Sequence, residues 1–215
     1  YDDAKELAAV FQGTKSGYSY GRQVNPTVTA LESKVTVMES GVASVCFGTG
    51  MAAIGTTMFA LLRSGDHIVS SAFLFGNTNS LFNTFGQMDI NVSFVDATSV
   101  DAVAAAVTEK TRVVFVETIA NPRTQVADLA RIGEFCAQHG LVYVVDNTMT
   151  SPYLFQAKAV GASLVVNSLT KYIGGHGNAL GGAVTELGNY DWSTFPNIYP
   201  EYQGGEPTKW GITQI

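Results

Sequence analysis

The chain has 215 residues, of which 46% are hydrophobic, so it can bury a sizeable core as one large domain or two small ones. Charged residues account for only 14%, which is typical of a chain with extensive buried contacts, including contacts to another subunit or domain. The net charge is −6 and no basic cluster occurs, which argues against nucleic acid or an anionic membrane as a partner.

The cellular compartment is predicted from two further features. No signal peptide opens the chain and no apolar run approaches the length of a membrane span, so a reducing cytoplasm is the simplest location. Cys46 and Cys136 are far apart and lie in apolar or helical patterns, so we expect free thiols and neither a disulfide nor a metal site. Because the chain starts at Tyr1, without methionine, we expect further residues before it.

The spacing of apolar residues predicts two successive helices at the start of the chain, followed by strands that alternate with helices to about residue 187. The predicted helices span residues 3–12, 26–41, 51–62, 77–87, 100–107, 128–139 and 152–160, and the predicted strands span residues 42–47, 67–71, 91–95, 112–117, 141–146, 162–167 and 182–185. Strands such as 113–116 are continuously apolar, which indicates burial on both faces. The sequence therefore predicts an α/β fold, a mainly parallel sheet with helices on both faces.

A lysine follows the predicted strand 162–167, in the tetrapeptide Ser168-Leu169-Thr170-Lys171. Ligands of α/β sheets bind outside the carboxyl ends of the strands, and a lysine buried there can lose its proton because burial disfavours the ammonium form. A neutral amine condenses with an aldehyde, and the hydroxyls of Ser168 and Thr170 suit a phosphate. These residues suggest a site at which pyridoxal phosphate forms a Schiff base with Lys171. The alternative is a surface lysine in a loop.

A carboxylate, Asp146, ends the preceding predicted strand 141–146. A carboxylate beside a pyridine nitrogen keeps that nitrogen protonated, and the protonated ring is the electron sink of pyridoxal chemistry. Because the two strands are consecutive, we expect Asp146 and Lys171 to lie at one edge of the sheet. The alternative is an aspartate that caps the next turn.

Gly48-Thr49-Gly50 lies between a predicted strand and a predicted helix, where bare backbone amides bind phosphate. A plain tight turn explains the glycines equally well. A nucleotide-binding fingerprint is incomplete, because position 53 is alanine where a third glycine would stand.

Further polar and aromatic residues fit the same kind of ligand. Asn121 could hydrogen-bond a ring oxygen, or could be only a turn residue before a proline. Arg22 with Tyr20 could bind a phosphate, since a guanidinium matches phosphate oxygens, or could be solvated in a loop. One of Phe73 and Phe75 could stack on a flat ring, although packing in the core is the alternative.

Five segments recur in a fixed order along nearly the whole chain: Tyr20-x-Arg22-x-x-Asn25-Pro26-Thr27, Gly48-x-Gly50-Met51-Ala52-Ala53, Glu117-x-x-x-Asn121-Pro122, Asp146-Asn147-Thr148 and Ser168-x-Thr170-Lys171-Tyr172-x-x-Gly175-His176. Together they resemble the γ-subfamily of fold-type I pyridoxal phosphate enzymes, the Cys/Met metabolism group. That group contains cystathionine synthases and lyases, methionine γ-lyase, and the O-acetyl- and O-succinylhomoserine sulfhydrylases.

The resemblance implies a role for each of these residues. Lys171 would hold the cofactor and then move protons on the substrate, Asp146 would pair with the pyridinium nitrogen, and Asn121 would contact the ring hydroxyl. The residues that would bind the phosphate are Gly50, Met51, Ser168 and Thr170. Tyr20 and Arg22 would reach the phosphate of a neighbouring subunit, so a homodimer or homotetramer with a shared site is implied.

The resemblance also implies a division of the chain. We expect an N-terminal arm at residues 1–26, a cofactor-binding domain at 27–187 and a loop-rich tail at 188–215. The family's C-terminal domain, with the arginine that binds the substrate carboxylate, is expected to be missing after Ile215. Phe75 stands where the family usually has a tyrosine over the cofactor ring, so it can stack but cannot transfer a proton.

From the resemblance we expect an enzyme that acts on an O-acylhomoserine and replaces its γ-substituent with sulfide, giving homocysteine. Some sulfhydrylase-like members resemble the Phe-Gly-Asn-Thr sequence found here at residues 75–78. The alternatives within the family are a cystathionine or methionine γ-lyase and a cystathionine γ-synthase. A further alternative is a truncated module that binds the cofactor, or only a partner, without turnover.

Overall fold

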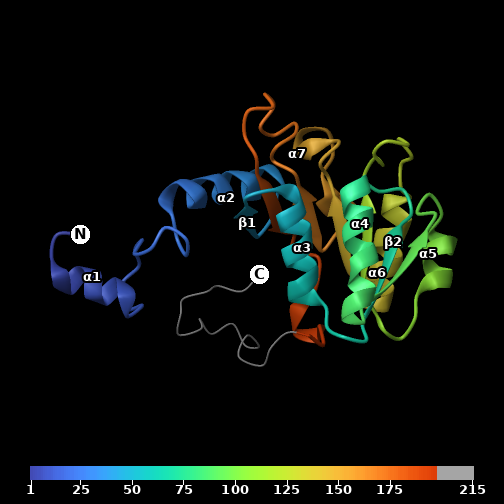
Figure 1. The fold of residues 1–215 in the computed structure, drawn as a ribbon, viewed down its shortest axis with the longest axis horizontal. Coiled ribbons are helices and arrows are strands. Elements are labelled where there is room, and N and C mark those ends of the chain that lie inside the picture. Colours follow the sequence, from blue (N-terminus) through green and yellow to red (C-terminus); the bar gives the residue numbers. More distant parts are fainter. Residues whose placement is uncertain (198–215) are drawn as a thin grey trace.

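The computed structural model describes residues 1–197 (Figure 1), and residues 198–215, most of the predicted tail, lie outside the described residues. The α-helices are α1 (Ala4–Phe11), α2 (Pro26–Met38), α3 (Gly50–Leu61), α4 (Gly76–Thr84), α5 (Val100–Ala106), α6 (Leu129–His139) and α7 (Ser151–Leu154). Short 3₁₀ helices are η1 (Phe85–Met88), η2 (Ala157–Val160) and η3 (Trp192–Thr194). The strands are β1 (Ala43–Phe47), β2 (His67–Ser71), β3 (Asn91–Val95), β4 (Thr111–Glu117), β5 (Val142–Asp146), β6 (Leu164–Asn167) and β7 (Gly182–Glu186).

The strands form one 7-stranded sheet in the order β1-β7-β6-β5-β4-β2-β3. Strand β7 runs antiparallel to β1 and β6, and the pairs from β6 across to β3 are parallel. At the carboxyl ends, Glu117 of β4 is opposite Asp146 of β5, and Asp146 is opposite Val166 of β6. The predicted α/β fold with a mainly parallel sheet is therefore confirmed.

Two hydrophobic cores cover opposite faces of this sheet (Figure 1). On one face, α3 and α4 contribute Met58 and Phe82. On the other face, α5 and α6 contribute Val103 and Ile132. Because successive side chains of a strand point to opposite faces, the apolar run 113–116 serves both cores, and all of its members are fully buried.

Local sequence signals set where two of the helices begin. Asn25 caps α2 by accepting from two backbone N–H groups of the first turn, and Pro26 occupies the first helical position, as predicted. Thr49 caps α3 by accepting from one backbone N–H group, that of Ala52, so this helix begins at Gly50, one residue before its predicted start. The N-terminus of α3 is thereby placed directly after the glycine turn.

Two predicted helices are divided in the structure. Residues 77–87 form α4 followed by η1, and residues 152–160 form α7 followed by η2. Between α7 and η2 the backbone of Phe155 and Gln156 is extended. The Gln156 side chain donates to the Met38 carbonyl at the end of α2 at 2.9 Å, so a tertiary contact competes there with continuation of the helix.

Cys46 and Cys136 are free thiols, the first partly buried and the second buried. Burial raises the pKa of Cys136 to about 12 and, together with the charge of Glu32, the pKa of Cys46 to about 11. Both thiols therefore stay protonated at neutral pH and are poor nucleophiles. Within residues 1–197, no helix has both the length and the apolar character that a membrane crossing requires.

The close packing of α6 on η2 leads to a testable prediction for Gly133. A Cβ atom at Gly133 would lie 1.7 Å from the Val160 carbonyl oxygen, whereas one at Gly86 would meet nothing within 4 Å. Alanine ordinarily stabilises a helix relative to glycine by about 0.5–1 kcal/mol. We expect Gly133→Ala instead to lower the free energy of unfolding by about 1–3 kcal/mol through overpacking, as measured by chemical denaturation. Gly86→Ala is the matched control, and equal stabilities of the two variants would contradict the expected clash.

Candidate functional site

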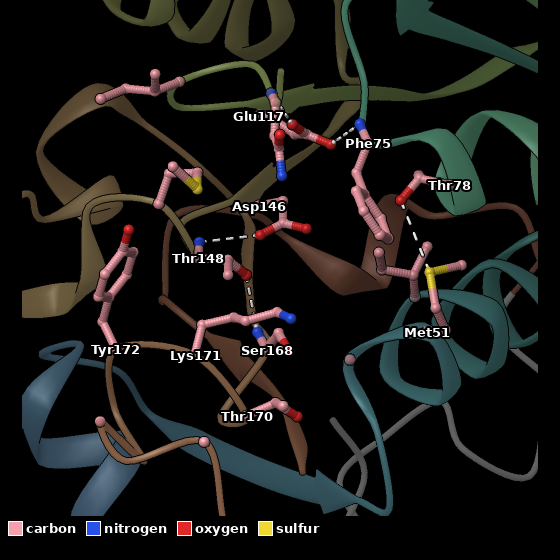
Figure 2. A pocket seen from close by; sticks show the side chains of 17 residues that line it. Met51, Phe75, Thr78, Glu117, Asp146, Thr148, Ser168, Thr170, Lys171 and Tyr172 are labelled. Carbon is pink, nitrogen blue, oxygen red and sulfur yellow. Dashed lines mark hydrogen bonds between the residues drawn. The ribbon is translucent and has the colours of Figure 1, made fainter. Parts of the chain in front are cut away.

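A cavity of about 700 Å³ opens at the carboxyl ends of β4, β5 and β6, beside the N-terminus of α3 (Figure 2). Its lining comes from segments far apart in the chain: Gly50, Met51, Ile54, Phe75, Thr78, Glu117, Ile119, Asn121, Asp146, Thr148, Met149, Ser168, Thr170, Lys171, Tyr172, Gly175 and Gly177. Cavities of this size accommodate cofactors and drug-sized ligands. Every residue to which the family resemblance assigns a place in the site lines this cavity, except Tyr20 and Arg22.

Lys171 and Asp146 reach the cavity from adjacent parallel strands. Asp146 ends β5, Lys171 lies in the loop after β6, and Figure 2 shows both side chains at the cavity. The sequence leads us to expect a buried Lys171. This expectation is wrong for the single chain, in which Lys171 is exposed. Its loop neighbours Tyr172 and Gly175 are exposed as well, so this side of the cavity is open.

Asp146 is a carboxylate without an ion pair in the described part of the chain. Its Oδ1 accepts a hydrogen bond from the Thr148 N–H at 2.9 Å. Burial raises the pKa of Asp146, and the hydrogen bonds from Thr148 oppose this rise in part. A cationic group beside the carboxylate would favour its ionised form, so this position suits a protonated heterocycle.

The start of α3 lies against the loop after β6. A Cβ atom at Gly50 would lie 2.8 Å from the Ser168 Cβ, so any side chain there would displace the loop. The Ser168 N–H donates to Thr148 Oγ1 at 2.8 Å, which ties this loop to the end of β5. The helix N-terminus and the Ser168 hydroxyl together offer donors to an anion. The Thr170 hydroxyl is already engaged, since it accepts from the Gly181 N–H at 3.0 Å and donates to the Gly181 carbonyl at 3.2 Å.

Glu117, to which sequence reasoning assigned no role, holds two of the predicted site residues in place. It ends β4 and is buried; Oε1 accepts from the Phe75 N–H at 2.6 Å and Oε2 accepts from the Asn121 N–H at 3.1 Å (Figure 2). Burial and the charge of Asp146 raise the pKa of Glu117 to about 7. The signal in the sequence is an acidic residue that ends an apolar strand, the same signal that singles out Asp146.

Of the two candidate aromatic residues, Phe75 lines the cavity and Phe73 does not. The Phe73 ring lies instead beside the Arg123 guanidinium, 5.8 Å from the ring centroid. Phe75 is 41% exposed and precedes α4, and Figure 2 shows its ring beside Met51 and Thr78. The ring of Phe75 is therefore accessible to a ligand in the cavity.

Tyr20 and Arg22 lie outside the cavity lining, in the exposed segment between α1 and α2. The Arg22 guanidinium carbon is 5.0 Å from the centroid of the Tyr20 ring. Figure 1 shows α1 and this segment extending away from the sheet. Their contact with the phosphate of a neighbouring subunit stays a prediction.

The chain matches, over residues 1–206, the model of the family described as Cys/Met metabolism PLP-dependent enzyme. It therefore belongs to this family of pyridoxal phosphate enzymes, which act on amino-acid substrates. The family resemblance predicted from the sequence motifs is confirmed.

Several curated relatives are similar over most of this chain. The O-acetyl-L-homoserine sulfhydrylase of Leptospira meyeri is 35% identical over 95% of this chain and 48% of its own length. The homocysteine synthase of Schizosaccharomyces pombe is 34% identical over 99% of this chain and 50% of its own length. The L-methionine gamma-lyase of Pseudomonas putida is 39% identical over 82% of this chain and 45% of its own length. The chain thus spans about half the length of the curated relatives it matches.

A solved structure agrees with this assignment. The crystal structure described as an O-acetylhomoserine (thiol)-lyase from Campylobacter jejuni, with N'-pyridoxyl-lysine-5'-monophosphate, has a TM-score of 0.84 and is 28% identical to this chain. The match covers 99% of this chain and 53% of that chain. The sheet and its helices therefore correspond to the large domain of such proteins.

The raised pKa of Glu117 predicts that stability falls with rising pH. The folded chain has a Glu117 pKa of about 7, above the ordinary 4.5, so between these values the folded state holds a proton that the unfolded state releases. The free energy of unfolding should therefore fall across this range by up to about 3 kcal/mol. Glu117→Gln keeps the size of the side chain but does not titrate, so the variant should lose less stability.

Chemical denaturation at matched pH values from about 5 to 8 measures this difference. Glu109→Gln, which makes the same change at an exposed glutamate, is the control. Identical pH profiles for the wild type and Glu117→Gln would contradict the raised pKa.

Proposed function

We propose that this chain forms the cofactor site of an enzyme that replaces the γ-substituent of an O-acylhomoserine with sulfide, giving homocysteine. The cofactor is pyridoxal 5'-phosphate, covalently joined to Lys171. The observation that carries this proposal is the convergence of Lys171 and Asp146 in one cavity from adjacent parallel strands. The amine suits the cofactor aldehyde, and the carboxylate suits the ring nitrogen.

The residues around the cavity fit the ring of this cofactor. Burial raises the pKa of Asp146, and a cationic ring nitrogen would favour the ionised carboxylate. Phe75 presents an accessible ring that can stack on a flat heterocycle. Asn121 lines the cavity with an amide that can hydrogen-bond a ring hydroxyl.

The other end of the cavity fits a phosphate. Gly50 begins α3, whose first backbone N–H groups have no carbonyl partner within the helix, and Met51 lies next to it in the lining. The Ser168 hydroxyl faces the same helix end. Thr170 would contribute its hydroxyl by exchanging a bond to Gly181 for one to the phosphate.

When bound, pyridoxal phosphate withdraws electrons from the α-carbon of an amino acid through its protonated ring. Asp146 would keep the ring nitrogen protonated. Lys171 would hold the cofactor and, once displaced by the substrate amine, take protons from and return protons to the substrate carbons. Phe75 lacks the hydroxyl that the family resemblance places there, so proton transfer falls to Lys171.

The complete site would need a second copy of the chain. Tyr20 and Arg22 are exposed on a segment that leads away from their own cavity, and Arg22 forms no ion pair within residues 1–197 (Figure 1). We propose that they bind the phosphate of a neighbouring subunit in a homodimer or homotetramer. Residues 1–26 would then act as an intersubunit arm and 27–187 as the cofactor-binding domain of a cytoplasmic enzyme.

Elimination is the second candidate reaction. Two L-methionine gamma-lyases, from Fusobacterium nucleatum and Pseudomonas putida, are 38% and 39% identical to this chain. Replacement and elimination share the same steps until the group on Cγ has left. They differ in whether sulfide then adds or 2-oxobutanoate is released.

The assignment of Lys171 predicts a colour. The protein loaded with pyridoxal phosphate should be yellow, and borohydride should abolish the visible band and fix the cofactor mass on the peptide that contains Lys171. Lys171→Ala should lose this band. Its activity should also fall, because proton transfer by a positioned side chain contributes about 10²- to 10⁴-fold to the rate. Lys110→Ala, at the opposite end of the parallel strands, is the control. A borohydride-sensitive band that persists in Lys171→Ala would refute the assignment.

The choice between replacement and elimination predicts different products. With O-acetylhomoserine, the loaded protein should form homocysteine only when sulfide is present, as measured by chromatography of the reaction mixture. 2-Oxobutanoate as the main product with and without sulfide would favour elimination. A yellow protein that forms neither product would support a chain that binds the cofactor without turnover.

A further inference from the structure

A carboxyl group that the proposed chemistry does not use lies between the strand ends of the site. Glu39 follows α2, and its side chain is fully buried, with 0% exposure. It bonds to the side chains of Asn147 and Asn167, which are also buried. Asn147 directly follows Asp146 and Asn167 directly precedes Ser168, so a single carboxyl group bridges the ends of β5 and β6.

The hydrogen bonds at Glu39 leave two oxygen atoms unmatched. Glu39 Oε1 accepts from Asn167 Nδ2 at 2.6 Å and from Asn147 Nδ2 at 3.4 Å. Glu39 Oε2 and Asn167 Oδ1 are both buried and have no hydrogen-bond partner within the described residues. Such acceptors lose their hydration without compensation, which is unfavourable. One proton on Oε2 would supply the missing donor, because a carboxylic acid and an amide can form two complementary hydrogen bonds.

We propose that Glu39 is a neutral carboxylic acid, paired with the Asn167 amide, that positions the strand ends carrying Asp146 and Lys171. Its Oε1 accepts from Asn167 Nδ2, and its protonated Oε2 donates to Asn167 Oδ1. The protonation state stands on the buried contacts alone. The positioning of Asp146 and Lys171 for a cofactor rests on the proposed function.

No charged group on the surrounding elements forms an ion pair with Glu39 within residues 1–197. On α2, Glu32 accepts from a backbone N–H of β1 at 2.9 Å. On η2, the Lys158 ammonium donates at 2.9 Å to a carbonyl of the turn after α2. On β7, Glu186 accepts at 2.8 Å from the backbone N–H of Gly188. Asp146 at the end of β5 and Lys171 after β6 line the cavity.

Burial is therefore the main influence on the pKa of Glu39. It raises the pKa of the carboxyl group, and the hydrogen bonds from Asn167 and Asn147 lower that pKa in part. The direction agrees with the need for a proton on Oε2. An ionised Glu39 would instead leave Oε2 and the Asn167 carbonyl oxygen buried without a donor.

The pairing affects the site because it belongs to a larger set of contacts. The Asn147 N–H donates to the Val166 carbonyl at 2.8 Å, and the Asn147 side chain donates to the Phe155 carbonyl at 2.9 Å. Glu39 adds Asn167 and the end of α2 to these contacts. The ends of β5 and β6 are thereby held together through buried hydrogen bonds, so loss of one member should move the others.

Two substitutions separate a neutral acid from an ionised one. Glu39→Gln mimics the neutral acid, because its amide offers one acceptor and one donor to Asn167, whereas Glu39→Ala offers neither. Glu32→Gln makes the same substitution at a partly buried glutamate on α2, the helix that Glu39 follows, and is the matched control.

Denaturant titrations from about pH 5 upward test the protonation state. Above the ordinary glutamate pKa of 4.5, the unfolded wild type releases a proton that the folded state keeps, so wild-type stability falls with pH. The ratio of the unfolding equilibrium constants of the wild type and Glu39→Gln should rise about tenfold per pH unit until the folded-state pKa is reached. The ratio of the unfolding equilibrium constants of the wild type and Glu32→Gln should rise less with pH. A pH-independent ratio, or a Glu39→Gln variant that fails to fold or is no more stable than Glu39→Ala, would overturn the proposal.

Infrared spectroscopy gives a second readout without unfolding. At about pH 5.5, roughly one unit above the ordinary glutamate pKa, the wild-type spectrum minus that of Glu39→Gln should contain the carbonyl band of a protonated carboxylic acid. A carboxylate band in its place would contradict the proposal.

The positioning role is tested on the protein loaded with pyridoxal phosphate. Glu39→Ala should lower the occupancy of the lysine-linked cofactor severalfold and shift the pH profile of its visible band, and Glu39→Gln should restore both. An unchanged band and pH profile in Glu39→Ala would overturn the positioning role. If the wild type itself shows no such band, the proposed function fails, while the denaturation and infrared results still decide whether Glu39 is protonated.

Discussion

Parallel hydrogen bonding among β4, β5 and β6 is the interaction on which the rest of the structure depends. It sets Glu117 opposite Asp146 and Asp146 opposite Val166, so the loops that follow these strands leave the sheet at one edge. Parallel strands require crossover connections, and the chain makes them through α6 and through α7 with η2. The cavity lies at this edge, between the loops and the N-terminus of α3. Lys171 and Asp146 line the same cavity because the adjacent strands β5 and β6 end side by side.

Three acidic groups at this edge form hydrogen bonds with different kinds of partner. Glu117 accepts from two backbone N–H groups, Glu39 bonds to two side-chain amides, and Asp146 accepts from the backbone of Thr148. Burial raises the pKa of each. Of the three, only Glu117 and Asp146 line the cavity. Both carboxylate oxygens of Glu117 accept hydrogen bonds from backbone N–H groups. Asp146 is therefore the main group in the cavity that would attract a cationic ring, while Glu117 and Glu39 form hydrogen bonds with the surrounding segments.

Much of the site can be predicted from the sequence, because Asp146 and Lys171 each follow an apolar run that is long enough for one buried strand. Glu117 ends such a run too, but its partner Phe75 is 42 residues away, and the contact uses a backbone N–H that leaves no trace in the side-chain pattern. The burial of Lys171 is predicted wrongly for a related reason. The apolar strand 162–167 is buried, whereas the exposure of Lys171 depends on the loop beyond it.

The sequence by itself determined the order of the main helices and strands, the burial of the central strands on both faces and the family to which the chain belongs. Apolar periodicity, the N-cap at Asn25 and the glycine turn depend only on residues close together in the chain. They can therefore be predicted from the sequence. Only the tertiary structure decided which hydrogen bonds Glu39 and Glu117 make and which side of the cavity stays open. Those contacts join segments far apart in the chain, and they depend on strand register, where a shift of one residue would turn each side chain to the opposite face.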